Sequence, residues 1–311
     1  MSARTIEISV KGRWIRVPAL DIKGRTIVAS GRAPKIAEIH QEYWLEDEVK
    51  DPASYLDQIR ASKLNADLFT FTQKLPNTEP RFSYPFQMKS VAAIRVSSFD
   101  DWWRSVSSDT RRNVKLSKTR GLVLRIEKLN EDLVRGIVGI NNETPIRQGR
   151  KFWHYGKTFE EVTKDYASFP DRSYYITGYV DDELVAFVKA VVVGDVLAIM
   201  QNLSRIRYRD KKPANALIAK AVEIAAEKRL KFITYFQYRY GNKGDDPLTE
   251  FKRRTGFEEL LLPKFYVPLT FKGTLALNLG LYRPLQEVLP EGVSGALRDL
   301  RTGWYSWRNR L

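Results

Sequence analysis

The order of strands and helices predicted for the second half of the chain limits its fold most. After a short strand, "VLRIEK", come two helices, three strands, a long helix, a strand, a short helix and a final strand. The three consecutive strands, "SYYITGYV", "ELVAFVKAVVV" and "VLAIMQNL", are joined by the turn-forming pairs "DD" and "GD". We therefore predict an antiparallel meander within a mixed sheet, in a protein of the α/β (α+β) class.

The segment before the long helix, "RDKKPAN", is the first candidate binding site. Helix N-termini leave backbone N–H groups unpaired and concentrate partial positive charge, so they bind phosphate well. Arg209, Lys211 and Lys212 add three cations there, and Pro213 suits the first helical position. The sequence predicts a site for a phosphate-bearing ligand, with a solvated loop before an ordinary helix as the alternative.

The loop "NNETPIRQGRKFWHYGK", Asn141 to Lys157, is the second candidate site. Its arginines offer planar forks for carboxylate or phosphate, and its aromatic rings could stack a sugar or a base. His154 ordinarily titrates near neutrality, so it could accept the proton of an amine. The alternative is a packed loop whose arginines pair with Glu143, Glu160 or Glu161.

Composition excludes several chemistries. The chain has no cysteine and only two histidines, His40 and His154, which excludes thiolate nucleophiles, disulfides and multi-His zinc sites. No run of about 18 uncharged apolar residues predicts a membrane span, and no apolar signal core opens the chain. The net charge of +15 favours an anionic partner. We therefore expect a metal-free, cytoplasmic protein.

The first half is predicted as a smaller α/β unit. Strands are expected at "TIEISVKGRWIRVP", "RTIVASG", "ADLFTFTQ" and "SVAAIRV", and helices at "PKIAEIHQEYW" and "PASYLDQIRASKL". A long polar helix, "SFDDWWRSVSSDTRRNVKLSKTRG", then leads to the second unit. The predicted domains are residues 1–120, 121–271 and a helical tail, 272–311. No internal repeat is visible in the sequence.

Three stretches of the second half carry a resemblance to a known family. "WWRSVSSDTRRNVKLSKTRG", "KKPANALIAKAVEIAAEKRLKFITYFQY" and "LTEFKRRTGFEELLLPKFYVPL" follow one another over roughly residues 100–270. In this order they resemble the GNAT acyltransferase superfamily, and more closely its Fem-type branch of peptidoglycan bridge ligases. The resemblance implies a mostly antiparallel sheet flanked by helices, in a tandem of one degenerate and one complete GNAT-like unit.

That resemblance implies transfer of an acyl group from acyl-CoA to an amine, without a metal. Two features depart from the GNAT pattern: no glycine follows Lys212, and Lys252 stands where many GNAT enzymes have a tyrosine acid. The predicted catalytic residues are His154, Lys252 and Tyr235, with a helix-surface lysine as the alternative for Lys252. The predicted donor-binding residues are Gln201, Leu203, Arg209, Lys211, Lys212, Ala214 and Asn215. The predicted acceptor-binding residues are Glu143, Arg147, Gln148, Arg150, Trp153, Tyr155, Lys157 and Gln237.

Two other functions stay open at this stage. One is transfer from aminoacyl-tRNA to a cell-wall precursor; the other is a non-catalytic RNA-binding protein that uses the cations of residues 111–120. The tail repeats apolar residues at spacings of three and four, with arginines elsewhere around the helix. This tail could contact an anionic membrane at its inner face, or dock on its own domain.

Overall fold

The structure is a computed structural model, and it describes residues 3–10, 13–31, 33–41, 48–147, 150–239 and 247–282. The first half contributes β1 (Arg4–Val10), β2 (Arg13–Ile22), β3 (Arg25–Ser30), β4 (Ile36–Ile39), α2 (Pro52–Arg60), β5 (Leu68–Thr72) and β6 (Phe86–Arg95). Strands β1 to β4 pair antiparallel with their neighbours along the chain. After the crossover through α2, β5 pairs with β4 in parallel.

Two helices, α3 (Phe99–Ser105) and α4 (Ser108–Thr119), connect the halves. The second half contributes β7 (Val123–Glu127), α5 (Glu131–Asn141), β8 (Ile146–Arg147), β9 (Arg150–Lys151), α6 (Phe159–Tyr166), β10 (Ser173–Val180), β11 (Glu183–Val193), β12 (Val196–Ser204), the 3-10 helix η1 (Ile206–Lys211), α7 (Pro213–Glu227), β13 (Phe232–Thr234), α8 (Pro247–Arg254), β14 (Glu258–Pro268) and α9 (Phe271–Asn278). The antiparallel meander of β10, β11 and β12 is confirmed, and β13 follows it in parallel to β12.

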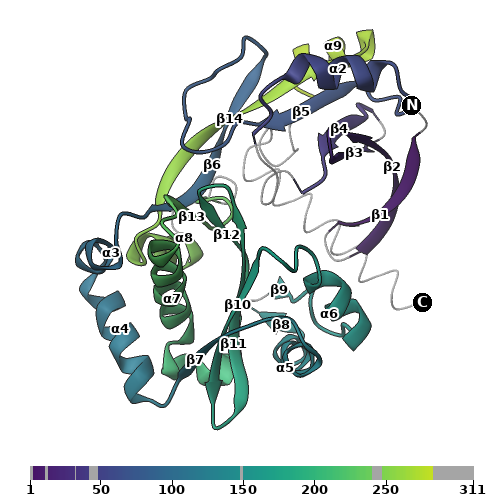
Figure 1. Cartoon of the computed structure of the whole chain (residues 1–311). Helices are drawn as coiled ribbons and strands as arrows, with labels where there is room; N and C mark the ends of the chain where they lie inside the picture. Colours follow the sequence, from purple (N-terminus) through teal and green to yellow (C-terminus); the bar gives the residue numbers. More distant parts are fainter. Residues whose placement is uncertain are drawn as a thin grey trace.

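Twelve strands form one continuous sheet, in the order β1-β2-β3-β4-β5-β14-β6-β13-β12-β11-β10-β7 (Figure 1). The last strand of each half lies beside the other half: β6 pairs with β13, and β14 pairs with β5. Each half therefore runs through a meander, a crossover helix and a parallel strand, and then exchanges a strand. The α/β fold class is confirmed, and the backbone repeats although the sequence does not.

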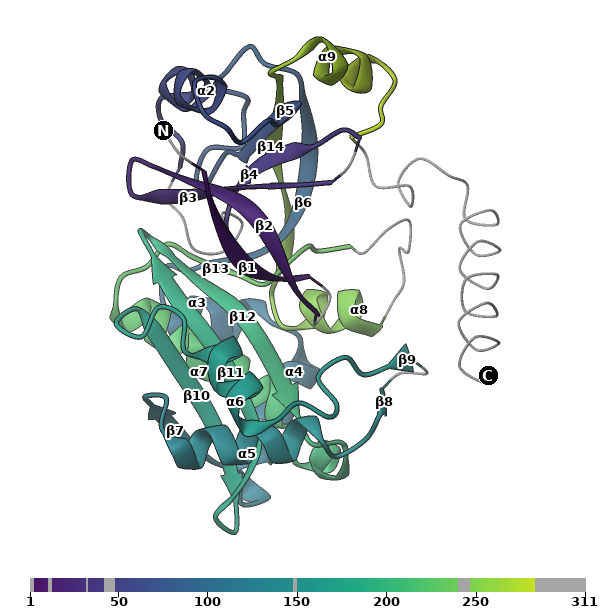
Figure 2. The same cartoon turned by 90° about the vertical axis from the view of Figure 1, so that its right-hand side faces the viewer.

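Helices cover both faces of the second half of the sheet (Figures 1 and 2). Helix α7 lies on one face with α3 and α4, and its Leu217 and Val222 pack in the same buried cluster as Val188 and Ile199 of the sheet. Helices α5 and α6 lie on the other face, where Phe187 is buried. The buried residues of α7 form one stripe along the helix, and this stripe fixes α7 against the strands.

Several elements differ from the sequence prediction. The opening stretch "TIEISVKGRWIRVP" contributes to two paired strands, β1 and β2, and not to one. Residues 34–44 were predicted to form a helix, but Ile36–Ile39 form β4, because alternate residues turn inward and both edges of the strand find partners. Residues 42–47 lie outside the described chain. The long polar helix is two helices, since Val106 is extended and Ser107 caps α4 by accepting from Thr110 N.

The strand predicted as "KFITYFQY" is also shorter, because β13 ends at Thr234. Two residues later Phe236 has φ +53°, which turns the chain out of the sheet. The division at residues 120 and 271 stays a prediction. Packing crosses the first boundary, because Trp102 and Val106 belong to the same buried cluster as α7.

Candidate active site

The two parallel strands of the second half separate after three residue pairs. Val196–Ala198 pair with Phe232–Thr234, and β12 then continues alone on that side to Ser204. A register shift on β12 leaves Met200 unpaired, because Lys189 of β11 faces Gln201 while Ala190 faces Ile199. β12 is buried through Ile199 and half-buried from Met200 onward. The strands therefore border an opening in the sheet.

His154 lies against β12 beside this opening. Its Nε2 is 3.3 Å from the side-chain nitrogen of Gln201, and its ring packs 5.2 Å from Phe152 and 4.7 Å from Trp153. An amide nitrogen only donates, so this contact requires a neutral imidazole with Nε2 unprotonated. Its Nδ1 is buried and has no hydrogen-bond partner within the described chain.

Burial, with smaller contributions from the charges of Lys157 and Arg147, lowers the pKa of His154 to about 4. The prediction that His154 titrates near neutrality is therefore wrong. A group with this pKa is neutral at pH 7, but it is too weak a base to hold a proton taken from an alkylammonium ion. Its one acceptor lone pair, on Nε2, already faces the Gln201 amide, so His154 holds that side chain in place and has no acceptor left for an incoming amine.

Arg147 anchors the loop to the fold. Its guanidinium donates to the carbonyl oxygens of Ile140 at 2.9 Å and Ser204 at 3.0 Å, and lies 4.2 Å from the ring centre of Phe152. It also lies 3.5 Å from the Glu143 carboxylate, which is the pairing expected of a packed loop. Both terminal nitrogens of this predicted acceptor-binding residue are thus engaged in holding α5, the loop and β12 together.

The same loop is tied to η1, the segment that leads into α7. Glu143 accepts from the backbone N–H groups of Ile206 at 2.6 Å and Arg207 at 3.1 Å. Lys157 forms an ion pair with Asp165. Trp153 and Tyr155 remain exposed, so these two predicted acceptor-binding residues are open to a ligand. Gln148 and the side chain of Arg150 lie outside what the structure describes.

The N-terminus of α7 faces outward without a capping side chain among the described residues. Lys212 occupies the N-cap position with φ +54° and ψ 40°, a left-handed conformation that costs a non-glycine residue about 1–2 kcal/mol. The first-turn N–H groups of Ala214 and Asn215 have no partner within the helix geometry. Arg209 and Lys211 precede them in η1. Burial lowers the pKa of Arg147, and the charge of Arg209 makes a smaller contribution in the same direction. Five of the predicted donor-binding residues thus converge here, while Gln201 and Leu203 lie on β12.

Lys252 lies beneath the end of β13, where three predicted residues meet. Its Nζ donates to the Gln237 carbonyl oxygen and lies 4.9 Å from the ring centre of Tyr235. Tyr235 is itself buried between the rings of Phe236 and Phe257. Lys252 is fully buried, so the alternative of a helix-surface lysine is wrong.

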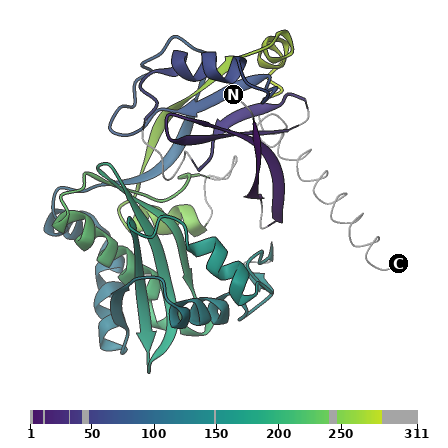
Figure 3. The ribbon, with the colours of Figure 1, turned by 45° about the vertical axis from the view of Figure 1, so that its right-hand side comes forward.

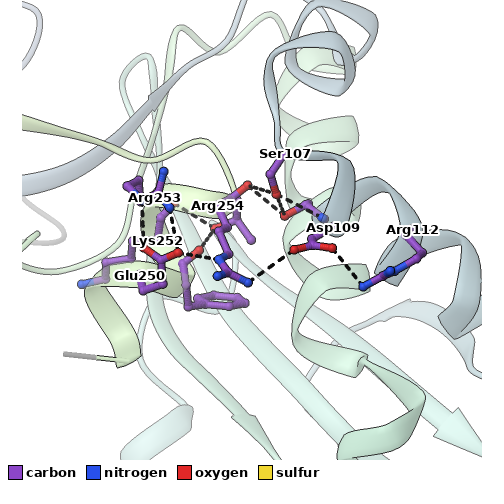
Figure 4. Close-up of polar contacts among 10 residues, drawn as sticks. Ser107, Asp109, Arg112, Glu250, Lys252, Arg253 and Arg254 are labelled. Carbon is purple, nitrogen blue, oxygen red and sulfur yellow. Dashed lines mark hydrogen bonds and ion pairs between the residues drawn. The ribbon is translucent and has the colours of Figure 1, made fainter. Parts of the chain in front are cut away.

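Polar contacts with α4 hold the helix that carries Lys252 (Figure 4). Thr110 Oγ1 donates to the Arg254 carbonyl oxygen at 2.8 Å, and the Arg254 guanidinium lies 3.5 Å from Asp109. Glu250 pairs with both Arg253 and Arg254. These contacts fix α8, and with it the position of Lys252.

A cavity of about 620 Å³ adjoins the paired part of β12 and β13, between the two halves of the molecule. Its apolar lining includes Val91, Val196 and Leu262, beside the hydroxyl-bearing Thr234. The cations that line it are Lys23, Arg25, Lys50 and Lys74, and the acids are Glu48, Asp51 and Asp195. No local sequence pattern indicates this cavity, because its residues come from segments far apart along the chain.

Lys189 is a second feature that the sequence analysis missed. It is buried on β11 opposite Gln201, and its Nζ donates to the carbonyl oxygens of Tyr166 at 2.7 Å and Ser168 at 2.9 Å. Burial lowers its pKa to about 8, which the charge of Asp165 partly opposes. A lysine inside the apolar strand "ELVAFVKAVVV" was the available signal. Its hydrogen bonds place it at the C-terminal end of α6, beside the candidate site.

The described residues contain neither a metal-binding cluster nor a membrane-spanning helix. Within the described ranges, no group of three or more His, Asp or Glu residues is arranged to hold a metal ion. No helix in the same part of the chain is long and apolar enough to cross a bilayer.

Comparison with solved structures confirms the fold. The chain is similar to L-PGS from Bacillus licheniformis, with 11% identity, a TM-score of 0.53, and coverage of 81% of this chain and 84% of that one. It is also similar to FemX, with 10% identity, a TM-score of 0.50 and coverage of 88% and 89%. The C-terminal DUF2156 domain of an Agrobacterium fabrum protein matches with 10% identity, a TM-score of 0.54 and coverage of 84% and 87%.

No protein-family model matches the sequence, and no curated protein matches it by sequence. The likeness is therefore one of fold. The chain has the GNAT-like fold in its Fem-type form, as the resemblance of its sequence predicted.

Proposed function

We propose that the protein is an N-acyltransferase that moves an acyl group from acyl-CoA to an amine of an anionic acceptor. The observation that carries this proposal is the open N-terminus of α7, flanked by Lys211 and Lys212, next to the opening between β12 and β13. Phosphates of the donor would lie at that helix end, which would place the attached carbonyl beside β12. The likeness of the fold to FemX supports this proposal.

The reaction needs a held donor, a neutral amine and a polarised carbonyl. The amine nitrogen attacks the thioester carbon, the C–N bond forms and the C–S bond breaks. Neutral His154 accepts from the Gln201 amide and so positions that side chain on β12 beside the opening. The proton leaves to water or to the departing thiolate, because the low pKa of His154 keeps it from holding the proton. Lys252 acts by positioning Gln237 and Tyr235.

The acceptor would lie in the cavity between the halves. Its volume suits a sugar- or peptide-sized body, and Lys50 and Lys74 stand among its cations. Val196 and Thr234 line this cavity and also belong to the strand pair that opens toward His154. An acceptor in the cavity could therefore present an amine to the opening. We expect this reaction to take place in the cytoplasm.

A second candidate is transfer from aminoacyl-tRNA to a cell-wall precursor. It is favoured by the likeness to FemX and by Pro213, which removes one backbone donor from a helix end that also lacks glycine. Helix α4 also exposes Arg112, Lys115 and Lys118 toward solvent, and Arg120 at its end donates to the Asp210 carbonyl of η1. A polynucleotide bound at the end of α7 could continue along α4.

A thermal-shift series with CoA, acetyl-CoA, a long-chain acyl-CoA and tRNA distinguishes the donors. A ligand that binds only the folded state raises Tm with its concentration. We expect a shift with the acyl-CoA compounds that disappears in Lys211→Glu/Lys212→Glu. A shift with tRNA alone would favour the second candidate if transfer follows, and a non-catalytic RNA-binding protein if it does not. A shift that survives the double reversal would place the donor elsewhere.

A further inference from the structure

Helix α9 is anchored firmly by one face. Gly273 and Ala276 are buried, and a Cβ on Gly273 would lie 1.9 Å from the Asp67 carbonyl oxygen. Thr270 caps the helix by accepting from Gly273 N at 3.0 Å, and its hydroxyl donates to the Asp67 carboxylate at 2.9 Å. The Leu269 N–H donates to the Asp67 carbonyl at 2.8 Å. These contacts fix which face of α9 points outward.

The outward face is apolar. Phe271 is 84% exposed, Leu275 50%, Leu279 62%, and Leu281, just past the helix, 58%. The first three recur every four residues, so they form one stripe. Scattered exposed hydrophobic residues are ordinary, but four large ones within eleven positions form a patch that marks an interaction surface. Helix α9 lies at the end of the molecule opposite β7 (Figures 1 and 3).

We propose that this face of α9 docks the protein on an anionic membrane surface. Lys272 is exposed beside the stripe, and the chain as a whole carries a net charge of +15. The sequence that follows α9 combines Trp304 and Trp307 with several arginines, a composition typical of segments that lie in the bilayer interface. The apolar tail pattern predicted from the sequence lies outside the described residues. This inference does not depend on the proposed acyl transfer.

Vesicle sedimentation of the full-length protein tests the proposal. The vesicles are phosphatidylcholine alone, or phosphatidylcholine mixed with phosphatidylglycerol. We expect binding to the mixed vesicles, weakened at least about tenfold in Phe271→Ser/Leu275→Ser because both side chains would leave the apolar layer. Lys272→Glu should weaken binding by a smaller factor that salt abolishes. The matched control is Val123→Ser/Ile126→Ser on β7, where both residues are also exposed, and it should bind like the parent.

Three outcomes would overturn the proposal. Equal binding by the α9 variant and the parent would place the membrane contact elsewhere. A parent that stays in the supernatant and elutes as a dimer, which the α9 variant converts to a monomer, would make this face an interface between copies. A parent that stays in the supernatant as a monomer, with a lower Tm in the α9 variant alone, would mean that its own chain covers the face.

Discussion

The two halves of the molecule follow the same backbone path but end their crossover helices differently. In each half a meander leads through a helix to a strand that pairs in parallel over three residues. In the first half Asp51 caps α2, accepting from Ser54 N at 3.3 Å and pairing with Lys23 at 3.0 Å. In the second half Lys212 stands at the matching place. At the N-terminus of α2, the carboxylate of Asp51 therefore takes the place that a bound anion could occupy. At the N-terminus of α7, cations surround the corresponding place.

The halves also differ in what precedes the meander. Residues 11–12 alone separate β1 from β2, whereas α5, β8, β9 and α6 lie between β7 and β10. That longer connection carries His154 to β12. The comparison teaches that the shared backbone does not define the site. An uncapped helix end and a covering loop define it, and the second half has both.

Substitution of Arg147, which anchors the loop, should have the largest effect on the free energy of unfolding. Arg147→Ala removes two hydrogen bonds from a charged donor to the Ile140 and Ser204 carbonyls, and should lower the free energy of unfolding by about 3–5 kcal/mol. Arg4→Ala in the first half removes only exposed contacts, with Asp21 and Thr26, and should change the free energy of unfolding far less. Urea denaturation measures both. A small loss in Arg147→Ala with a raised acceptor KM would mean that Arg147 grips a ligand.

Between pH 4 and 6.5, His154 should contribute strongly to the pH dependence of stability. Its pKa is about 4 in the folded protein and about 6.5 when unfolded, so the unfolded chain binds more protons between these values. The contribution of His154 is therefore complete above pH 6.5 and falls by about 3 kcal/mol as the pH drops toward 4. His154→Gln should flatten this slope in denaturation curves. His40 of the first half also has a pKa lowered by burial, and His40→Gln should flatten the slope less. The reverse ranking would contradict the burial of His154.

Charge reversal at the N-terminus of α7 and at the N-terminus of α2 should affect acyl-CoA binding differently. Lys211→Glu/Lys212→Glu should weaken acyl-CoA binding about a hundredfold, because it opposes the helix dipole and removes two cations. Lys50→Glu, beside the capped end of α2, should leave acyl-CoA affinity unchanged. Isothermal titration measures both, with circular dichroism as the check on folding. Equal losses in both variants would mean that overall charge, and not the end of α7, attracts the donor.

The two smallest effects, those of Lys212→Gly and Asp51→Ala, should change the free energy of unfolding in opposite directions. Lys212→Gly relieves a left-handed conformation and should raise the free energy of unfolding by about 1 kcal/mol, while weakening acyl-CoA binding a few-fold. Asp51→Ala removes a helix cap and should lower the free energy of unfolding without affecting acyl-CoA binding. Thermal unfolding with and without ligand measures these changes. If Lys212→Gly loses stability, the left-handed Lys212 is held by contacts that the account omits.

Much of the second half was predictable from sequence, because its periodicities are long and unbroken. The buried stripe of α7 and the apolar strands of the meander set that half of the fold. β4 was mistaken for a helix because four residues carry too little pattern, and its strand character depends on β3 and β5 on either side. The strand exchange of β6 and β14 joins residues far apart in the chain, and no local pattern signals it.

The residues of the candidate site could be predicted from the sequence, but the burial and pKa of each residue could not. The sequence located His154, Lys252 and the cations before α7. Only the packed structure shows that His154 is buried enough to stay neutral, that Lys252 is fully enclosed, and that Arg147 holds the backbone. The hydrogen bonds of Lys189 likewise depend on where α6 ends. Burial and pKa follow from tertiary packing, which a single sequence does not display.

Hydrogen exchange with and without saturating acyl-CoA tests the central claim most directly. We predict that the ligand slows exchange at the first-turn amides of α7, Ala214 and Asn215, whose N–H groups would contact phosphate. The first turn of α2, already capped by Asp51, should exchange at the same rate in both samples. Protection at α2, or no protection at α7 despite saturation, would contradict the assignment of the donor site to the second half.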